Sequence, residues 1–457
     1  IKIRMKKHQL LSISPLDGRY ANECTELSTV FSEYNLIKTR LYVEISWFIH
    51  LSKEGQIKEL PSLSSKDKTF LTNIVRDFTT SEATKVKKIE SVTKHDVKAV
   101  EYYIKDKIKK NKSLEKYLEF VHIFCTSEDI NNLSYALMIK DGLALLLKQL
   151  GLITNDLNKK SIQYSRVAMI SHTHGQAATP TTMGKEMRIF YKRLDVLIKK
   201  LAKVKIMGKF NGATGNYSSH LVAYPNENWP KITQKFIADL GLKQNTHTTQ
   251  IESHDYISEI CNLLSHTNSV LLGFSQDMWS YISKSYFTQK NIKGEVGSST
   301  MPHKINPINY ENAEGNLGLS NSLLTFLSSK LVISRLQRDL SDSTVLRNIG
   351  VAFGYAIISY KNILIGQKKI VLNKNKIKSD LDECWEVLAE PIQMIARKFT
   401  QKDPYELLKK HTRGRKLDKR SIEAIISELD IPVKEKNKLL KLKPCDYIGM
   451  SEVLSKS

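Results

Sequence analysis

The chain has 457 residues and a formal net charge of +23, with 70 lysines and arginines against 47 acidic residues. Its 20 glycines and 11 prolines are few for this length, which favours long helices with few turns. Its cysteines lie far apart, form no CxxC pair and are odd in number, so we expect reduced thiols rather than a disulfide or zinc framework.

The composition also argues against membrane and nucleic-acid functions. No stretch approaches the ~18 apolar residues that a membrane helix requires, and the basic N-terminus lacks the apolar core of a signal peptide. Lysine runs such as 105–112, 368–378 and 434–443 are mixed with Asn and Ile and form no basic stripe interleaved with aromatic residues. Solvated helix faces explain them better than nucleic-acid binding. We expect a cytoplasmic protein that binds neither membrane nor nucleic acid.

Apolar periodicity predicts long helices along most of the chain. Residues 31–50 carry apolar side chains at three-to-four spacing, which is typical of one buried helical face. The run Thr126-Ser127-Glu128-Asp129 is typical of a helix start with an acidic first turn. Longer amphipathic segments cover 181–205, 256–284 and 315–331. Long helices without strand signals must pack on one another, so the sequence predicts an all-α helical bundle.

The expected domain organisation has three parts. We expect an N-terminal helical domain over residues 1–112 and a central domain with a long-helix bundle over 113–367. The Lys-rich stretch 368–378 is typical of a domain boundary, so a small C-terminal helical domain is expected over 368–457.

The most informative segment is GSSTMPHKINP at residues 297–307. Gly297 permits a sharp turn, and each proline removes a backbone donor, so no helix continues through this segment. We interpret Asn306 as the N-cap of the next helix and Pro307 as its first residue. The loop would then present Ser298 and Lys304 at a helix N-terminus, where anions bind. This arrangement is typical of a mobile catalytic lid, although an ordinary connector is the alternative.

A second segment, SHTHGQ at residues 171–176, places two imidazoles two positions apart. On a turn or extended loop they lie nearly together, and His is the side chain best suited to donate a proton near neutral pH. A metal site would need a third ligand, and no Asp, Glu or His lies at ligand spacing nearby. A surface or core role is the alternative for an isolated His.

Residues 294–307 resemble the signature loop of the fumarase/aspartase superfamily, whose lyases release fumarate by β-elimination. Eight fixed positions match, which disfavours the connector interpretation. Further runs resemble, in the same order, the adenylosuccinate lyases of the longer bacterial type. These runs are SPLDGRY at 14–20, TKHDVKAVE at 93–101, TQIE at 249–252 and SRLQRDLSDSTVLRN at 334–348.

This resemblance implies a fumarase/aspartase-type three-domain lyase and a set of site residues. Ser298 would be the general base and His174 the general acid, with no metal and no organic cofactor. The implied substrate-binding residues are Arg19, Tyr20, His95, Asp96, Thr126, Ser127, Gln250, Lys304, Asn306, Arg338, Ser343 and Arg347. Arg19 and Tyr20 would hold a nucleotide phosphate, because Arg forms a fork to phosphate oxygens. Lys94 departs from the pattern, since the related enzymes carry Asn there, and we assign its side chain no role.

The implied reactions convert adenylosuccinate to AMP and SAICAR, the imidazole-carboxamide succinyl nucleotide, to AICAR, each with release of fumarate. The implied assembly is a homotetramer with active sites shared between subunits. Other superfamily lyases remain alternatives: argininosuccinate lyase, aspartase or fumarase, none of which needs a phosphate pocket. A derivative that lost turnover and binds nucleic acid is a second alternative. Helix capping by Thr126 and Ser127, and surface ion pairing by the cations, would also explain those residues individually.

Overall fold

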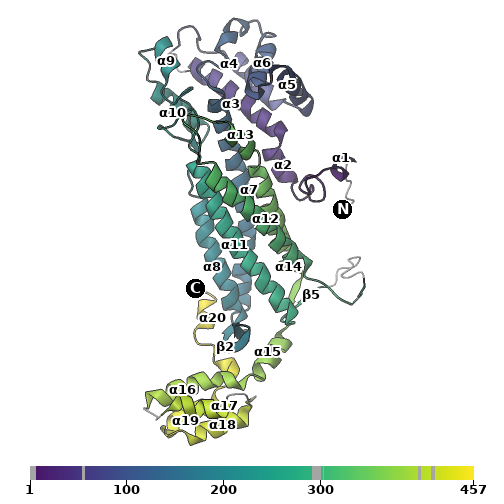
Figure 1. Ribbon diagram of the computed structural model, residues 1–457, viewed down its shortest axis with the longest axis vertical. Coiled ribbons are helices and arrows are strands. Elements are labelled where there is room, and N and C mark those ends of the chain that lie inside the picture. The colour runs from purple at the N-terminus through teal and green to yellow at the C-terminus, as the bar shows by residue number, and fades with distance from the viewer. Residues whose placement is uncertain (1–6, 54–56, 291–299, 302, 400–402, 413–416) are drawn as a thin grey trace. The chain divides into compact units, whose positions relative to one another are not determined.

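A computed structural model describes residues 7–53, 57–290, 300–301, 303–399, 403–412 and 417–457. Its contacts divide the chain into two compact units (Figure 1). The first unit comprises Ile1–Gln149, Leu197–Ser269 and Gly315–Lys361, and the second comprises Leu150–Val196, Val270–Glu314 and Asn362–Ser457. The three-domain division remains a prediction.

Five long helices contribute residues to both units: α7 (Ser127–Gln163), α8 (Met183–Leu201), α11 (Asp255–Ser283), α12 (Ile308–Lys330) and α14 (Ile349–Lys369). The other elements of the first unit are α1 (Lys7–Leu10), α2 (Thr25–Phe31), α3 (Glu33–Lys53), α4 (Ser65–Arg76), α5 (Thr80–Thr93), α6 (Asp96–Ile108), η1 (Glu115–Phe120), β3 (Met207–Gly208), α9 (Ser218–Ala223), α10 (Trp229–Asp239), β4 (Lys243–Gln244) and α13 (Ser341–Leu346). Those of the second unit are β1 (Ala168–Thr173), β2 (Gln176–Thr182), β5 (Phe287–Gln289), β6 (Ile370–Leu372), α15 (Lys374–Asp382), η2 (Trp385–Leu388), α16 (Ala389–Lys398), α17 (Pro404–Thr412), α18 (Lys419–Glu428), α19 (Val433–Lys441), η3 (Pro444–Asp446) and α20 (Ser451–Leu454).

The predicted helical character is confirmed, and the predicted stripes are buried faces. In α3, Ile37, Leu41, Ile45 and Phe48 are all at most 3% exposed. The predicted segments 181–205, 256–284 and 315–331 correspond to α8, α11 and α12; the ends differ by at most four residues, except that α12 begins seven residues before the predicted segment. The strands were not predicted. They form three two-stranded sheets, β1–β2 and β5–β6 antiparallel and β3–β4 parallel.

In the first unit, a buried chain of hydrogen bonds links the portions of α11, α12 and α14 that run side by side (Figure 1). The Tyr360 hydroxyl donates to Asn268 Oδ1 over 2.5 Å, and Asn268 Nδ2 donates to Ser320 Oγ over 3.1 Å. Ser320 Oγ in turn donates to the Ala352 carbonyl over 2.9 Å. Each of these hydrogen bonds pairs polar atoms that would otherwise be buried alone. The series of hydrogen bonds therefore fixes how the three helices align.

The second unit contains a separate apolar core built mainly from α15 to α19. Its members include Leu381, Ile392, Ile422 and Ile426, all at most 2% exposed. The hairpin of β1 and β2 contacts this part of the unit, and Ile170 of β1 belongs to the core. The core therefore supports the hairpin that carries His174.

Two expectations are corrected by the helices. The Glu311 N–H donates to the Pro307 carbonyl, so Pro307 is the cap of α12, which begins at Ile308, and the predicted start was one residue early. The segment Ser341–Lys369 contains an 18-residue window apolar enough to span a membrane, contrary to the expectation that no stretch approaches this. Of that window 61% is buried, as expected for a core helix of this fold.

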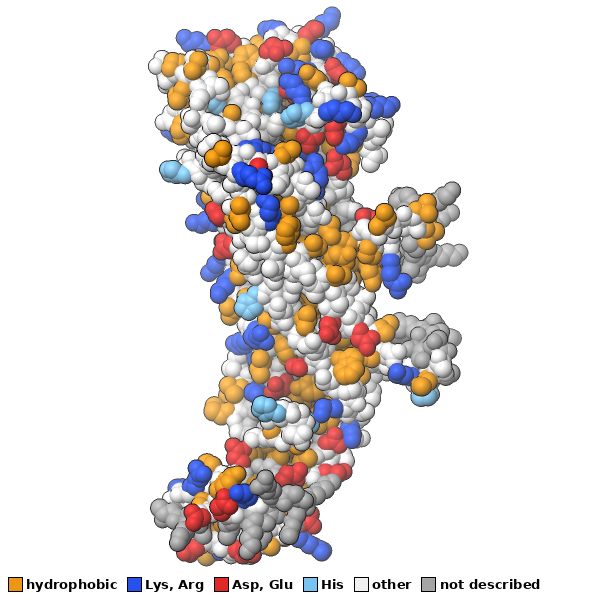
Figure 2. Space-filling model, in the orientation of Figure 1, with side chains coloured by type: hydrophobic (Ala, Val, Ile, Leu, Met, Phe, Trp, Pro, Cys, Tyr) orange, Lys and Arg blue, Asp and Glu red, His pale blue; other side chains and the backbone are white. Residues whose placement is uncertain are grey.

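Charges of both signs cover the surface shown in Figure 2, where Lys and Arg side chains are interspersed with Asp and Glu. Many lysines lie beside a carboxylate on the same helix, such as Lys376 beside Asp380 and Lys87 beside Glu90. Such pairs are typical of solvated helix faces.

Candidate active site

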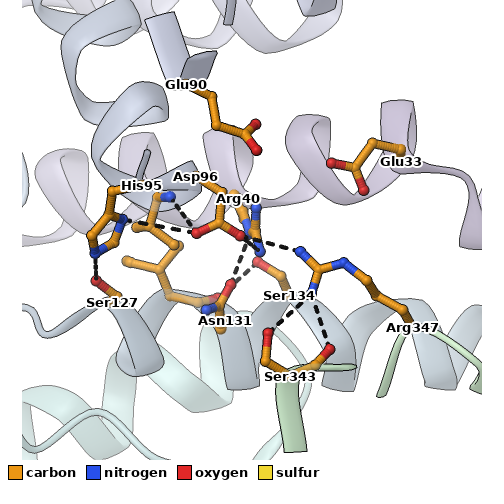
Figure 3. Close-up of polar contacts among 12 residues, drawn as sticks. Glu33, Arg40, Glu90, His95, Asp96, Ser127, Asn131, Ser134, Ser343 and Arg347 are labelled. Atoms are coloured by element: carbon orange, nitrogen blue, oxygen red, sulfur yellow. Dashed lines mark hydrogen bonds and ion pairs between the residues drawn. The ribbon is translucent and has the colours of Figure 1, made fainter. Parts of the chain in front are cut away.

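In the first unit, the N-termini of α6 and α7 and the short helix α13 meet, and they bring together five of the predicted site residues (Figure 3). Ser127 Oγ lies 3.4 Å from His95 Nε2. Arg347 NH2 lies 3.3 Å from Asp96 Oδ2, and its NH1 donates to Ser343 Oγ over 3.0 Å. Residues separated by up to about 250 positions in the sequence therefore form one polar cluster.

His95 is the N-cap of α6, and this role fixes its tautomer. Its Nδ1 accepts a hydrogen bond from the Lys98 backbone N–H over 3.3 Å. A neutral imidazole that accepts at Nδ1 carries its proton on Nε2, which faces Ser127 and can donate to an anion or hydroxyl. The side chain is half exposed, so this donor is accessible.

The departure at Lys94 has a backbone explanation. Lys94 ends α5 in the left-handed conformation, with φ 53°, and its N–H donates to the Glu90 carbonyl. Asn adopts this conformation more readily than most residues, so the Asn that the resemblance implies at this position would also suit the turn. The Lys94 side chain is exposed, so the substitution leaves the turn in place.

Asp96 is an anchor between two guanidinium groups. Arg40 NH2 lies 2.7 Å from Asp96 Oδ2, and Arg40 Nε donates to Asn131 Oδ1 over 2.7 Å. Burial raises the pKa of Asp96, but the charge of Arg40, the Val97 N–H and Arg347 together hold it below its ordinary value. Asp96 is therefore an ionised link that orients Arg347, and its predicted contact with substrate stays a prediction.

The start of α7 is fixed by Asp129. Its Oδ2 accepts from the Thr126 N–H over 2.8 Å, which confirms the predicted helix start. Its Oδ1 pairs with Lys209 Nζ at 2.9 Å, and both side chains are fully buried. Asp129 also accepts from the Asn211 N–H over 3.1 Å, so the segment after β3 is tied to the residues that carry Thr126 and Ser127.

Gln250 contacts the same segment from the other side. Its Nε2 donates to the Ala213 carbonyl over 3.0 Å, and its N–H donates to the Gln337 carbonyl over 3.2 Å. Gly215 is required nearby, because it has φ +80° and a Cβ there would lie 2.1 Å from the Thr248 carbonyl oxygen. Gln250 is thus held between the 211–215 turn and the segment that carries Arg338.

A cavity of about 800 Å³ lies within the first unit, beside the polar cluster to which Arg347 belongs. Ser14, Asp17 and Asn22 of the N-terminal segment line it, together with Arg347. Its volume is in the range of small-molecule sites. Arg19 is exposed in the same segment, with its guanidinium carbon 5.8 Å from the centre of the Tyr20 ring.

The predicted general acid, His174, belongs to the second unit. His174 is exposed in the turn between β1 and β2, in the left-handed conformation with φ 52°, followed by Gly175 with φ 76°. His172 lines a cavity of about 340 Å³ with Tyr286 and Asp380, and burial lowers its pKa. The two histidines therefore have different surroundings.

Two further predicted residues precede α12. Lys304 is exposed, and its N–H donates to the Met301 carbonyl over 3.0 Å, whereas Asn306 is partly buried. Ser298 lies outside the described residues, as does half of the predicted loop 294–307.

Comparison with known proteins identifies the family. Residues 18–319 match the lyase family, and residues 334–448 match the adenylosuccinate lyase C-terminal family. The adenylosuccinate lyase of Buchnera aphidicola subsp. Schizaphis graminum is 50% identical over 97% of this chain and 98% of its own. That of Escherichia coli K12 is 45% identical over the same shares of both chains. The chain belongs to the adenylosuccinate lyase family. It is a carbon–nitrogen lyase, as the motifs predicted.

Solved structures with low sequence identity share the fold of this family member. The 3-carboxy-cis,cis-muconate lactonizing enzyme of Pseudomonas putida aligns with a TM-score of 0.74, at 17% identity, over 94% of each chain. A fumarate lyase of Mesorhizobium sp. BNC1 aligns with the same TM-score at 15% identity. The predicted fumarase/aspartase-type fold is confirmed.

Three residues that support the site of this adenylosuccinate lyase family member were not singled out from the sequence: Arg40, Asn131 and Lys209. Arg40 lies on the buried face of α3 and is 1% exposed. A cation between the apolar residues Ile37 and Leu41 was the available signal, because a buried Arg requires a partner. Lys209 gave no such signal, since its partner Asp129 was interpreted only as an acid in the first turn of a helix.

We expect Asp96→Asn to lower the free energy of unfolding by about 2–3 kcal/mol, because it leaves the Arg40 cation buried without its carboxylate. Urea denaturation at pH 7 measures the loss. Since the folded-state pKa of Asp96 is below its ordinary 3.8, this stabilisation is present above pH 3.8 and is lost as the pH falls through the lower folded-state value. The difference in the free energy of unfolding between variant and wild type should therefore become smaller in strong acid.

The matched control is Asp77→Asn, which removes an acid from an ion pair with Arg76 whose side chains are 68% and 62% exposed. Exposed pairs contribute little, so the control should unfold at the wild-type urea concentration. An Asp96→Asn protein as stable as this control would contradict the anchoring role.

Proposed function

We propose that the chain cleaves adenylosuccinate to AMP and fumarate, and SAICAR to AICAR and fumarate, as a cytoplasmic enzyme of purine nucleotide biosynthesis. The observation that carries this proposal is the match to adenylosuccinate lyases over 97–98% of both chains. The cluster of His95, Ser127, Ser343 and Arg347 supports it, because it offers several donors to an anionic substrate.

The proposed chemistry is a β-elimination. Ser298, activated as an alkoxide by loop backbone donors and Lys304, removes the proton from the succinyl carbon β to the breaking C–N bond. Negative charge then develops on the adjacent carboxylate, which cations and fixed donors must stabilise. The electron pair expels the purine amine, and His174 protonates the departing nitrogen.

The remaining residues would bind the substrate. Lys304 and Asn306 anchor the loop and a carboxylate, and Thr126, Ser127 and Gln250 supply further donors at the start of α7. The Nε2 proton of His95 supports this assignment, since it adds a donor beside Ser127. Arg19 and Tyr20 hold the phosphate, with Arg338, Ser343 and Arg347 as additional donors. No cofactor or metal takes part in this scheme.

We further propose a homotetramer in which three subunits contribute to each site. Apolar side chains on the long helices support an extensive subunit interface. Leu319 and Phe326, seven positions apart on α12, are 52% and 53% exposed. A partner subunit that covers such side chains removes them from water.

The test compares substrates. We expect fumarate release from adenylosuccinate, followed by ultraviolet absorbance, and none from argininosuccinate or aspartate under the same conditions. Only adenylosuccinate carries a phosphate for Arg19 and Tyr20 to bind. Release of fumarate from argininosuccinate or aspartate in its place would indicate a different lyase. No turnover together with salt-dependent DNA binding would indicate a derivative that lost the enzyme activity.

A further inference from the structure

Three buried polar side chains lie together behind Arg338. Glu128 is in the first turn of α7, His254 precedes α11, and Asp342 is in α13. They are 2%, 2% and 5% exposed, and their nitrogen or oxygen ligand atoms lie within 4.8 Å of one another. None of the three was predicted to touch substrate. We call Glu128 and Asp342 the acidic pair; His254 lies beside them.

The acidic pair holds the Arg338 guanidinium. Arg338 NH1 donates to Glu128 Oε2 over 3.1 Å, and NH2 lies 4.0 Å from Asp342 Oδ1. The second oxygens, Glu128 Oε1 and Asp342 Oδ2, are buried and have no hydrogen-bond partner among the described residues. Arg338 itself is 19% exposed, so part of its fork of donors reaches the surface.

This geometry favours one proton on the acidic pair rather than a bound metal ion. The set of two carboxylates and one imidazole could ligate a cation. However, Arg338 already places a positive charge against both carboxylates, and a metal ion would have to displace it or be repelled by it. Two ionised carboxylates in this space would leave one negative charge uncompensated by Arg338, at a large desolvation cost.

The charges around the pair place the proton on Glu128. Burial is the main cause that raises the pKa of Glu128, and the charge of Asp342 adds to it; Arg338 and Lys209 oppose the rise, and the resulting pKa is about 7. His254 Nδ1 lies 3.2 Å from the Leu331 carbonyl and so donates to it. The titratable groups that face the pair are Arg338, Lys209, His254, Glu252 and Tyr256.

We propose that Glu128 and Asp342 share one proton, that the pair positions Arg338 for an anionic group of the nucleotide substrate, and that loss of this proton draws the guanidinium back. The proposal rests on the proposed function, in which Arg338 binds substrate. Glu128 and Asp342 are positioning residues, since they act through Arg338. As the pH rises through about 7, Glu128 ionises and attracts Arg338 more strongly, so substrate binding weakens.

The experiment compares KM for adenylosuccinate from pH 6 to 8.5 in wild type and Glu128→Gln. The amide keeps an oxygen that accepts from Arg338 but stays neutral, so we expect nearly equal KM values at pH 6. By pH 8.5 the wild-type KM should exceed that of the variant by about three- to tenfold. The substrate phosphate titrates in both proteins, so it cancels in the ratio of KM values. The ratio of kcat values should stay constant with pH, because binding is changed rather than the chemical step.

Further variants separate the explanations. Glu128→Ala removes the acceptor and should raise KM at every pH. Glu82→Gln is the matched control, because Glu82 pairs with Lys85 and Lys107 and contacts none of the site residues. It should keep the wild-type pH profile. Thermal unfolding of each variant shows whether the protein is folded.

The outcomes are distinct. A KM ratio that stays constant with pH, or a pH-dependent ratio of kcat values, overturns the shared proton. If the difference in KM between wild type and Glu128→Gln disappears on treatment with EDTA, the shared proton is overturned in favour of a bound cation. An Arg338→Ala protein with unchanged KM also overturns the positioning role, while fumarate release would still support the proposed function. Only the absence of fumarate release from the wild type refutes the proposed function itself.

Discussion

Replacing Ser298 by Ala is expected to lower kcat by ~10²–10⁴-fold, the typical cost of a lost general base. The succinyl proton is weakly acidic, and the proposed scheme assigns no other residue to remove it. Substrate contacts come from residues such as Arg19 and Arg347, so binding should survive. Steady-state kinetics and calorimetric titration of adenylosuccinate onto the inactive variant measure the two effects separately.

The matched control is Ser299→Ala, which removes the neighbouring hydroxyl from the same loop. It should retain far more activity than Ser298→Ala, because Ser299 is not the proposed base. Each substitution removes one hydroxyl from the same loop, so a general effect on the loop would be the same in both variants. Activity of Ser298→Ala above about a tenth of wild type would rule out its role as the base, since a lost base costs at least ~10²-fold. Equal losses in both variants would assign the effect to the loop rather than to one hydroxyl.

The helices were predictable because their signals are local. The stripe in residues 31–50 and the acidic first turn after Thr126 and Ser127 both follow from the short-range geometry of a helix, and α3 and α7 begin within two residues of the expected positions. The β1–β2 hairpin was missed because its sequence is rich in Ser, Thr and His, lacks apolar alternation and contains Pro180. Its pairing depends on packing against the C-terminal helices, which no local pattern records.

The site was predictable as a set of residues, through family motifs, but its supporting contacts were not. Asp96 was expected to bind substrate, and the structure shows it engaged with Arg40, a residue 56 positions away. Glu128 was read as an acid that favours a helix start, and it lies buried against Arg338, 210 positions away. Helix preferences explain why an acid such as Glu128 occurs at a helix start, whereas its contact with Arg338 depends on the tertiary fold. Such long-range pairs determine which charges of the motifs are available to a ligand.

His174→Gln is expected to lower kcat by ~10²–10⁴-fold at neutral pH, with a smaller effect on KM. The amide can form hydrogen bonds but cannot transfer a proton to the departing nitrogen. The structure adds a requirement that the sequence did not show. His174 lies in the left-handed conformation, and Gln adopts it less readily than Asn, so the turn could change together with the chemistry.

His174→Asn therefore accompanies His174→Gln, because Asn fits the left-handed turn and also lacks a transferable proton. Loss of activity in both variants assigns the effect to proton transfer, whereas activity recovered in the Asn variant assigns it to the turn. His172→Gln is the control within the same hairpin, and it should retain most of the activity, since His172 faces a separate cavity lined by Tyr286 and Asp380. A His174→Gln protein that stays fully active at neutral pH would remove His174 as the acid, and the exposed imidazole would then have only a surface role.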